Sequence, residues 1–135
     1  MDIIELSREF GKEIQKDQRF LNMRIAQQNA DEDTELQDVI GQFNLKRIAI
    51  DTESHNEEAD PQRLQVLNQE LRAIYDDAMG RPNMIAYNAA REEFDALLKR
   101  VNAIISLSAD GEDPETADYE ESACTGSCSS CAGCH

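Results

Sequence analysis

Apolar residues recur at every third or fourth position along most of this chain, a spacing that predicts amphipathic helices. The first stretch begins after Asp2, which can form a capping box with Glu5, and it carries Leu6, Phe10 and Ile14 on one face. We expect a first helix of roughly four turns here.

Two further helices are expected before residue 55. Asp17 restarts or bends the chain, and a second apolar stripe then runs to the acidic break at residues 31–33. Thr34 offers another capping box, with Gln37, and opens a third helix that ends near Glu53. The apolar face of this third helix is formed by Leu36, Val39, Ile40, Phe43 and Ile50.

Two longer helices with a heptad-like pattern follow a polar loop at residues 54–59. Asp60 caps the first, which has Pro61 in its first position. Its apolar residues alternate in steps of three and four: Leu64, Leu67, Leu71, Ile74 and Ala78. The second runs over residues 82–109, about 42 Å at 1.5 Å per residue. The sequence therefore predicts an all-α fold, a helical bundle built around a long antiparallel helical hairpin, with the other helices packed beside it.

The composition fits a small helical domain. The chain has 135 residues, of which 40% are hydrophobic and 5% aromatic, and this length supports one domain plus a tail. Its 28 acidic and 13 basic residues give a formal net charge of -15. A phosphate backbone would be repelled by this charge, and the basic residues are scattered, so we expect no direct contact with nucleic acid.

Charged residues interrupt every apolar run near the N-terminus, which reads Met1-Asp2-Ile3-Ile4-Glu5. We therefore expect neither a signal peptide nor a membrane span, and a cytoplasmic location. Cytoplasmic thiols are kept reduced. This argues against a disulfide framework for the four cysteines and leaves metal binding or redox chemistry.

The composition changes after the last predicted helix. Residues 110–121 contain seven acidic residues, no basic one and a proline, which indicates a disordered, solvated linker. The predicted organisation is a helical domain at residues 1–109, an acidic flexible linker at 110–123 and a cysteine-rich tail at 124–135.

The tail holds four cysteines in its twelve residues, in the pattern CxxxCxxCxxCH: Cys124, Cys128, Cys131 and Cys134. The small residues between them would allow the backbone to wrap closely around a metal centre. Structural zinc sites usually separate two cysteine pairs by a dozen or more residues, whereas iron-sulfur proteins use dense runs of this kind. We favour an iron-sulfur cluster of the four-iron type, with zinc as the alternative and an unmetallated tail as the third possibility.

Two sharper motifs overlap the tail. The last five residues match the CxxCH of c-type haem attachment, but that modification takes place outside the cytoplasm. The first three cysteines match the cluster loop of radical SAM enzymes, which require a barrel far larger than this chain. His135 is an alternative metal ligand, although solvent exposure is the commoner state of a terminal histidine.

Motifs of common enzyme classes are missing from the sequence, which has no phosphate loop, no HExxH and no GxGxxG. The histidine in the middle of the chain, His55, falls in the polar loop, where a solvated side chain is expected. We predict a protein that binds partners and is not an enzyme. The last predicted helix has an apolar arc wider than one hairpin seam, so we expect an oligomer and assign a partner-binding role to Tyr87, Phe94, Leu98 and Ile105.

Three sets of residues carry a family resemblance that covers roughly residues 1–109. They are Asp33, Leu36, Val39, Ile40 and Phe43; Leu64, Leu67, Leu71 and Ile74; and Pro82, Tyr87, Ala90, Phe94, Leu97, Leu98, Val101 and Ile104. With the cysteine tail as a second point of agreement, the chain resembles the YlbF/YmcA family of small helical regulators from Gram-positive bacteria.

The resemblance implies an adaptor. Members of this family assemble with each other and with a third protein, YaaT, into a complex that carries iron-sulfur clusters. That complex is associated with ribonuclease Y-dependent mRNA processing and with competence, sporulation and biofilm control. The resemblance makes the four tail cysteines the candidate cluster ligands. Two other functions remain open from the residues alone: a zinc- or iron-handling protein that delivers metal through its tail, and an oligomer whose tail senses oxidation.

Overall fold

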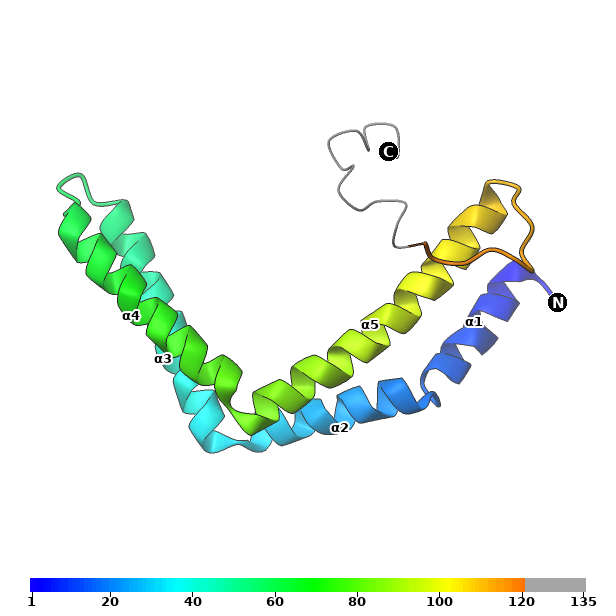
Figure 1. The fold of residues 1–135 in the computed structure, drawn as a ribbon, viewed down its shortest axis with the longest axis horizontal. Coiled ribbons are helices and arrows are strands. Elements are labelled where there is room, and N and C mark those ends of the chain that lie inside the picture. Colours follow the sequence, from blue (N-terminus) through cyan, green and yellow to red (C-terminus); the bar gives the residue numbers. More distant parts are fainter. Residues whose placement is uncertain (121–135) are drawn as a thin grey trace. The chain divides into compact units, whose positions relative to one another are not determined.

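The computed structural model describes residues 1–120, which contain five α-helices and no strand (Figure 1). They are α1 (Ile3–Ile14), α2 (Gln18–Glu32), α3 (Thr34–Ser54), α4 (Pro61–Gly80) and α5 (Pro82–Ala109). The chain divides into two compact units, residues 1–92 and the residues from 93 onward. The predicted all-α fold class is confirmed, and the helix boundaries follow the expected punctuation closely.

Aspartates begin the first four helices. In each case the carboxylate accepts a hydrogen bond from a backbone N–H of the first turn, which would otherwise lack a partner: Asp2 from Ile4, Asp17 from Arg19, Asp33 from Leu36 and Asp60 from Gln62. One cap differs from the prediction, which chose Thr34 with Gln37. Asp33 takes this position instead, and the Gln37 side chain donates to the carbonyl of Ala30 at 2.9 Å.

The antiparallel hairpin is formed by α3 and α4, which lie side by side along their lengths (Figure 1). The rings of Phe43 and Tyr75 meet across it with centroids 6.1 Å apart, and Lys46 pairs with Glu70. The heptad-like pattern had suggested that α4 would pair with the helix after it. A polar loop returns the chain from α3 to α4, whereas Arg81 is extended (φ -75°, ψ 140°) and turns the chain between α4 and α5.

The core of the first unit lies where α2, α3 and α4 converge. Its buried residues are Ala30, Leu36, Val39 and Ala78, with Ile40, Ile74 and Met84 packed against them. Leu36 has no exposed surface. The Asn83 side chain, at the start of α5, donates to the Asp33 carboxylate at 2.9 Å and so ties this helix to the α2–α3 corner.

Along residues 1–120, no helix combines the length and the apolar character that a membrane span would need.

Candidate functional site

The four predicted cluster ligands, Cys124, Cys128, Cys131 and Cys134, lie outside the described residues, as does His135. Within residues 1–120, no three histidine, cysteine or carboxylate side chains are gathered in an arrangement that could hold a metal ion. The metal-site prediction therefore stays a prediction about the tail.

The chain reverses direction at the end of α5. Gly111 has φ +93°, a conformation that glycine adopts without steric cost. Its N–H donates to the carbonyl of Ser108, and the N–H of Glu112 donates to the carbonyl of Leu107 at 3.0 Å. These two bonds satisfy carbonyls that the end of the helix leaves without partners, and they form a Schellman motif. The acidic segment begins with a defined turn.

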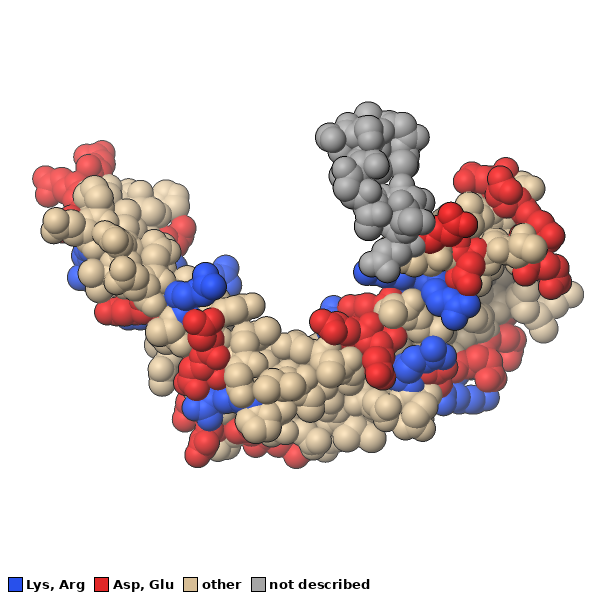
Figure 2. All heavy atoms as spheres, viewed as in Figure 1, with Lys and Arg blue, Asp and Glu red and all other residues tan. Residues whose placement is uncertain are grey.

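A bidentate ion pair joins the acidic segment that follows Gly111 to α5. Arg100 donates from Nε and from its terminal nitrogen to the two carboxylate oxygens of Asp118, at 3.0 and 2.8 Å. The Arg100 guanidinium lowers the pKa of Asp118, and a hydrogen bond from the Tyr119 backbone N–H adds to this effect. Figure 1 shows the segment turning back along α5, and Figure 2 shows carboxylates gathered around it.

The disordered acidic linker predicted at residues 110–123 lies partly within the described residues, where Asp118 pairs with Arg100. The acidic composition gave no sign that one carboxylate would find a guanidinium 18 residues earlier in the chain. Gly111, directly after the helix, was the available signal, because a glycine there commonly ends a helix and redirects the chain.

The four predicted partner-binding residues differ in exposure. Phe94 is buried, with 9% of its surface exposed, whereas Ile105 is 59% exposed. Tyr87 and Leu98 are half-buried, and the Tyr87 hydroxyl accepts a hydrogen bond from Arg91 at 2.9 Å. Phe94 is thus packed in the folded chain itself, and Ile105 is the most open of the four.

Leu98 and Ile105 lie on the same side of α5, because they are seven residues apart, almost two full turns. Arg100 is two residues from Leu98, about 200° around the helix, so the acidic segment returns along the other side. We call Leu98 and Ile105 the α5 apolar face. On this face Leu98 is half-buried and Ile105 is 59% exposed, so the face is open at Ile105.

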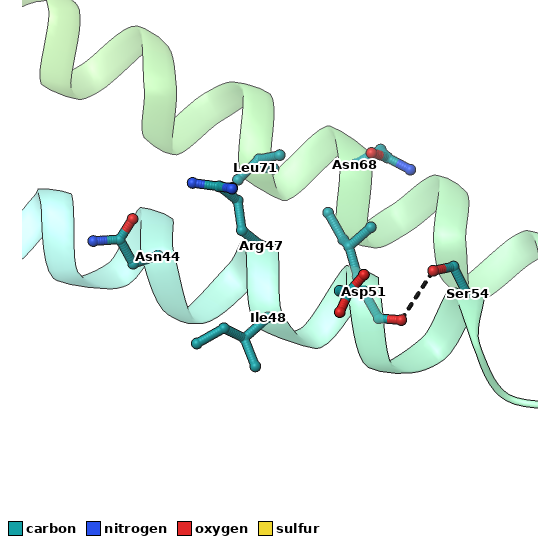
Figure 3. Close-up of a pocket in the computed structure, with 8 residues that line it drawn as sticks. Asn44, Arg47, Ile48, Asp51, Ser54, Asn68 and Leu71 are labelled. Atoms are coloured by element: carbon teal, nitrogen blue, oxygen red, sulfur yellow. Dashed lines mark hydrogen bonds between the residues drawn. The ribbon is translucent and has the colours of Figure 1, made fainter.

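A shallow groove of about 730 Å³ runs between α3 and α4, and Figure 3 shows its lining. Its polar side chains include Arg47, Asp51 and Asn68. The Ser54 hydroxyl at one end donates to the backbone carbonyl of Asp51 at 2.9 Å, so its proton is directed at the helix and not at a base. His55 is exposed, with Nδ1 2.8 Å from the same carbonyl oxygen.

A family model described as "Control of competence regulator ComK, YlbF/YmcA" matches residues 3–108. This range spans all five helices almost to the end of α5 and excludes the acidic return and the cysteine tail. Neither the curated proteins nor the solved structures contain a match to the chain.

Proposed function

The chain belongs to the YlbF/YmcA family, and we propose that it is a non-enzymatic regulatory adaptor in the control of competence. In this role it assembles with a YmcA-like paralogue and a YaaT-like protein, and the assembly modulates ribonuclease Y-dependent mRNA processing, with effects on sporulation and biofilm formation. The net charge of -15 suits an adaptor that leaves contact with RNA to the nuclease.

The observation that carries the proposal is the α5 apolar face. Ile105 is 59% exposed and lies on the same side of the helix as Leu98, within the residues that the family model matches. Apolar side chains that stay open on a regulator of this family are suited to a partner helix. Arg100, which pairs with Asp118 of the acidic segment, lies about 200° around α5 from Leu98.

The cysteine tail supplies a donor set that fits an iron-sulfur cluster. Four thiolates within eleven residues match the ligand number of a four-iron cluster, and zinc accepts the same donors. Such a cluster would add redox or oxygen sensitivity to the adaptor. Cys124, Cys128, Cys131 and Cys134 are the residues that would hold it.

Co-expression with the paralogue tests the adaptor role. A glutamate in place of Leu98 would place a charge in the contact, so Leu98→Glu should remove the paralogue from the purified complex. Ala89→Glu is the matched control, because Ala89 is exposed on the opposite side of the same helix. Size-exclusion chromatography with mass detection would show whether the complex forms.

The proposal would be wrong if the wild-type chain failed to bind the paralogue, or if Leu98→Glu and Ala89→Glu formed the complex equally well. In cells, Leu98→Glu should lengthen or shorten the half-lives of the same mRNAs that a deletion of the gene affects. Unchanged half-lives in both strains would leave the adaptor without its proposed effect on mRNA processing.

A further inference from the structure

Two consecutive turns bend the acidic segment back before it reaches Arg100. The first is the Schellman motif at Gly111. In the second, the backbone carbonyl of Asp113 accepts hydrogen bonds from the N–H groups three and four residues later, at 3.2 and 3.0 Å, and its carboxylate accepts one from the N–H two residues later at 3.0 Å. These local bonds already direct the chain, so the ion pair of Asp118 has less chain entropy to overcome.

Asp118 is selected from this segment by its position. Its two carboxylate oxygens accept from Arg100 at 3.0 and 2.8 Å, the bidentate geometry that a guanidinium and a carboxylate prefer. The Glu115 carboxylate, three residues earlier, makes no ion pair with any described residue. The contact therefore depends on one carboxylate and not on the overall charge of the segment.

Arg100 lies well before the end of α5. Nine residues separate it from Ala109, the last residue of the helix, so it lies about 14 Å back along the axis at 1.5 Å per residue. In the sequence it falls between Leu98 and Ile105, the two residues of the α5 apolar face. The ion pair with Asp118 thus returns the chain to the level of this face along the helix (Figure 1).

The chain from this anchor to the tail is short. Six residues lead from Asp118 to Cys124, the first candidate ligand, and a chain of this length spans at most about 20 Å. From Gly111, at the end of the helix, thirteen residues lead to Cys124, which would span up to about 45 Å. The ion pair therefore removes more than half of the reach that Cys124 would have from the helix end.

We propose that the pair of Arg100 with Asp118 is a tether, which keeps the first cysteine of the tail beside the middle of α5 and not beyond its end. Both residues act by position, and neither binds the metal. A partner helix on the α5 apolar face is then within reach of the tail, so that the tail and the partner come into contact. The part of this inference that concerns the partner rests on the proposed function, whereas the tether itself does not.

Paramagnetic broadening in NMR spectra measures where the tail lies. In a full-length reference chain, Cys124 is kept as the single cysteine, the other three are replaced by serine, and a nitroxide is attached to Cys124. The nitroxide should broaden the backbone amide signals of residues 97–104, around Arg100. Asp118→Asn should reduce this broadening by about two- to fivefold, the population change that corresponds to the loss of an exposed ion pair.

Two further variants separate the ion pair from the general charge of the segment. Glu115→Gln removes one charge from the same segment and should match the reference chain, because Glu115 has no ion pair with the described residues to lose. Asp118→Glu keeps a carboxylate that can accept from the guanidinium, and it should retain most of the broadening. Equal broadening in Asp118→Asn and the reference chain, or broadening confined to residues 106–109, would overturn the tether.

Metal analysis of the chain with all four cysteines shows whether Asp118 positions the tail or belongs to its centre. The four candidate ligands all follow residue 118, so Asp118→Asn should keep the iron, sulfide or zinc content of the wild type. A loss of metal in Asp118→Asn that Glu115→Gln does not show would make Asp118 a ligand and overturn the tether. The nitroxide measurement requires no metal, so the tether stands even if the tail binds none.

A photoreactive residue tests the contact with the partner. A benzophenone side chain in place of Ala123 should crosslink to the bound paralogue, and about two- to fivefold less so in Asp118→Asn. Equal crosslinking in both chains would overturn the contact between tail and partner. If the paralogue does not bind the chain at all, the adaptor proposal falls, and the nitroxide measurement still decides the tether.

Discussion

Asp33 ends α2 and begins α3, and its carboxylate connects three helices. It accepts hydrogen bonds from the backbone N–H of Leu36 and from the side chain of Asn83. The bond from Leu36 is the largest cause of the lowered pKa of Asp33, followed by the bond from Asn83, and the nearby Arg81 adds a favourable charge. The carboxylate is therefore charged throughout the neutral range and holds the corner in place.

Arg81 has the corresponding position between α4 and α5. Its guanidinium lies 3.3 Å from the carboxylate of Glu35, on α3, and 3.4 Å from that of Asp77, on α4. Nε is within ion-pair distance of Asp77 but makes no hydrogen bond, although this atom is buried. The two terminal nitrogens of Arg81 donate hydrogen bonds to the carboxylates of Glu35 and Asp77, at 3.3 and 3.5 Å, and so hold Arg81 at this corner.

A substitution at Leu36 measures how much the core beside these corners contributes to the free energy of unfolding. Its side chain has no exposed surface, and Leu36→Ala should lower the free energy of unfolding by about 2–5 kcal/mol through lost burial and the cavity left behind. Val66→Ala, at a position that is 50% exposed, should cost much less. Urea unfolding followed by circular dichroism measures both. Equal losses in the two variants would show that Leu36 does not belong to the core.

At the scale of the element, the end of α5 determines where the acidic segment goes. The Schellman motif at Gly111 reverses the chain, and the pair of Arg100 with Asp118 fixes the return. The side chains of both residues remain largely exposed, at 63% and 44%, so the pair is screened by solvent and stabilises the segment only slightly. It is suited to positioning a segment and contributes little to the stability of the fold.

Asp118→Asn should release this segment. We expect amide hydrogen exchange in residues 112–118 to rise by about two- to fivefold, the size typical of an exposed ion pair, while exchange in α3 and α4 stays unchanged. High salt should have a similar effect in the wild type and little effect in Asp118→Asn.

The pH dependence of the return follows from the lowered pKa of Asp118. Because the folded-state pKa lies below the ordinary value of 3.8, the pair contributes fully above pH 4. This contribution is lost as the pH falls through the lowered pKa. A loss of protection from exchange in residues 112–118 as the pH is lowered from 8 to 6 would contradict this assignment, because Asp118 remains charged over that range.

At the scale of the whole molecule, the family model and the helices end within a residue or two of each other, before the acidic segment. The helical part is therefore expected to fold without the tail. Deletion of residues 122–135 should leave the circular dichroism spectrum per residue of the helical part unchanged and remove all bound iron, sulfide or zinc. Anaerobic purification with metal analysis provides this measurement. A truncated chain that unfolds would assign the cysteines a structural role.

The same metal analysis separates the candidate centres of the full chain. Iron and sulfide in equal amounts indicate a cluster, whereas zinc alone favours the metal-handling alternative. A chain that binds neither, and keeps its activity when all four cysteines are replaced by serine, would not need a metal centre in its tail.

The sequence by itself determined the five helices and most of their ends. Apolar spacing is a property of each helix alone, and the aspartate caps bond backbone N–H groups only two or three residues away. Gly80, Arg81 and Pro82 marked the break between α4 and α5 for the same local reason. The resemblance to the YlbF/YmcA family was also readable from the chain, and the family match over residues 3–108 confirmed it.

Only the tertiary structure decided which helix pairs with α4, which apolar residues of α5 are buried, and where the acidic segment goes. Phe94 and Ile105 follow the same spacing, yet one is 9% and the other 59% exposed. Asp33 meets Asn83 across 50 residues, and Arg100 meets Asp118 across 18. Such contacts depend on the path of the whole chain. A helical pattern defines the apolar side of each helix but not the neighbour that covers it.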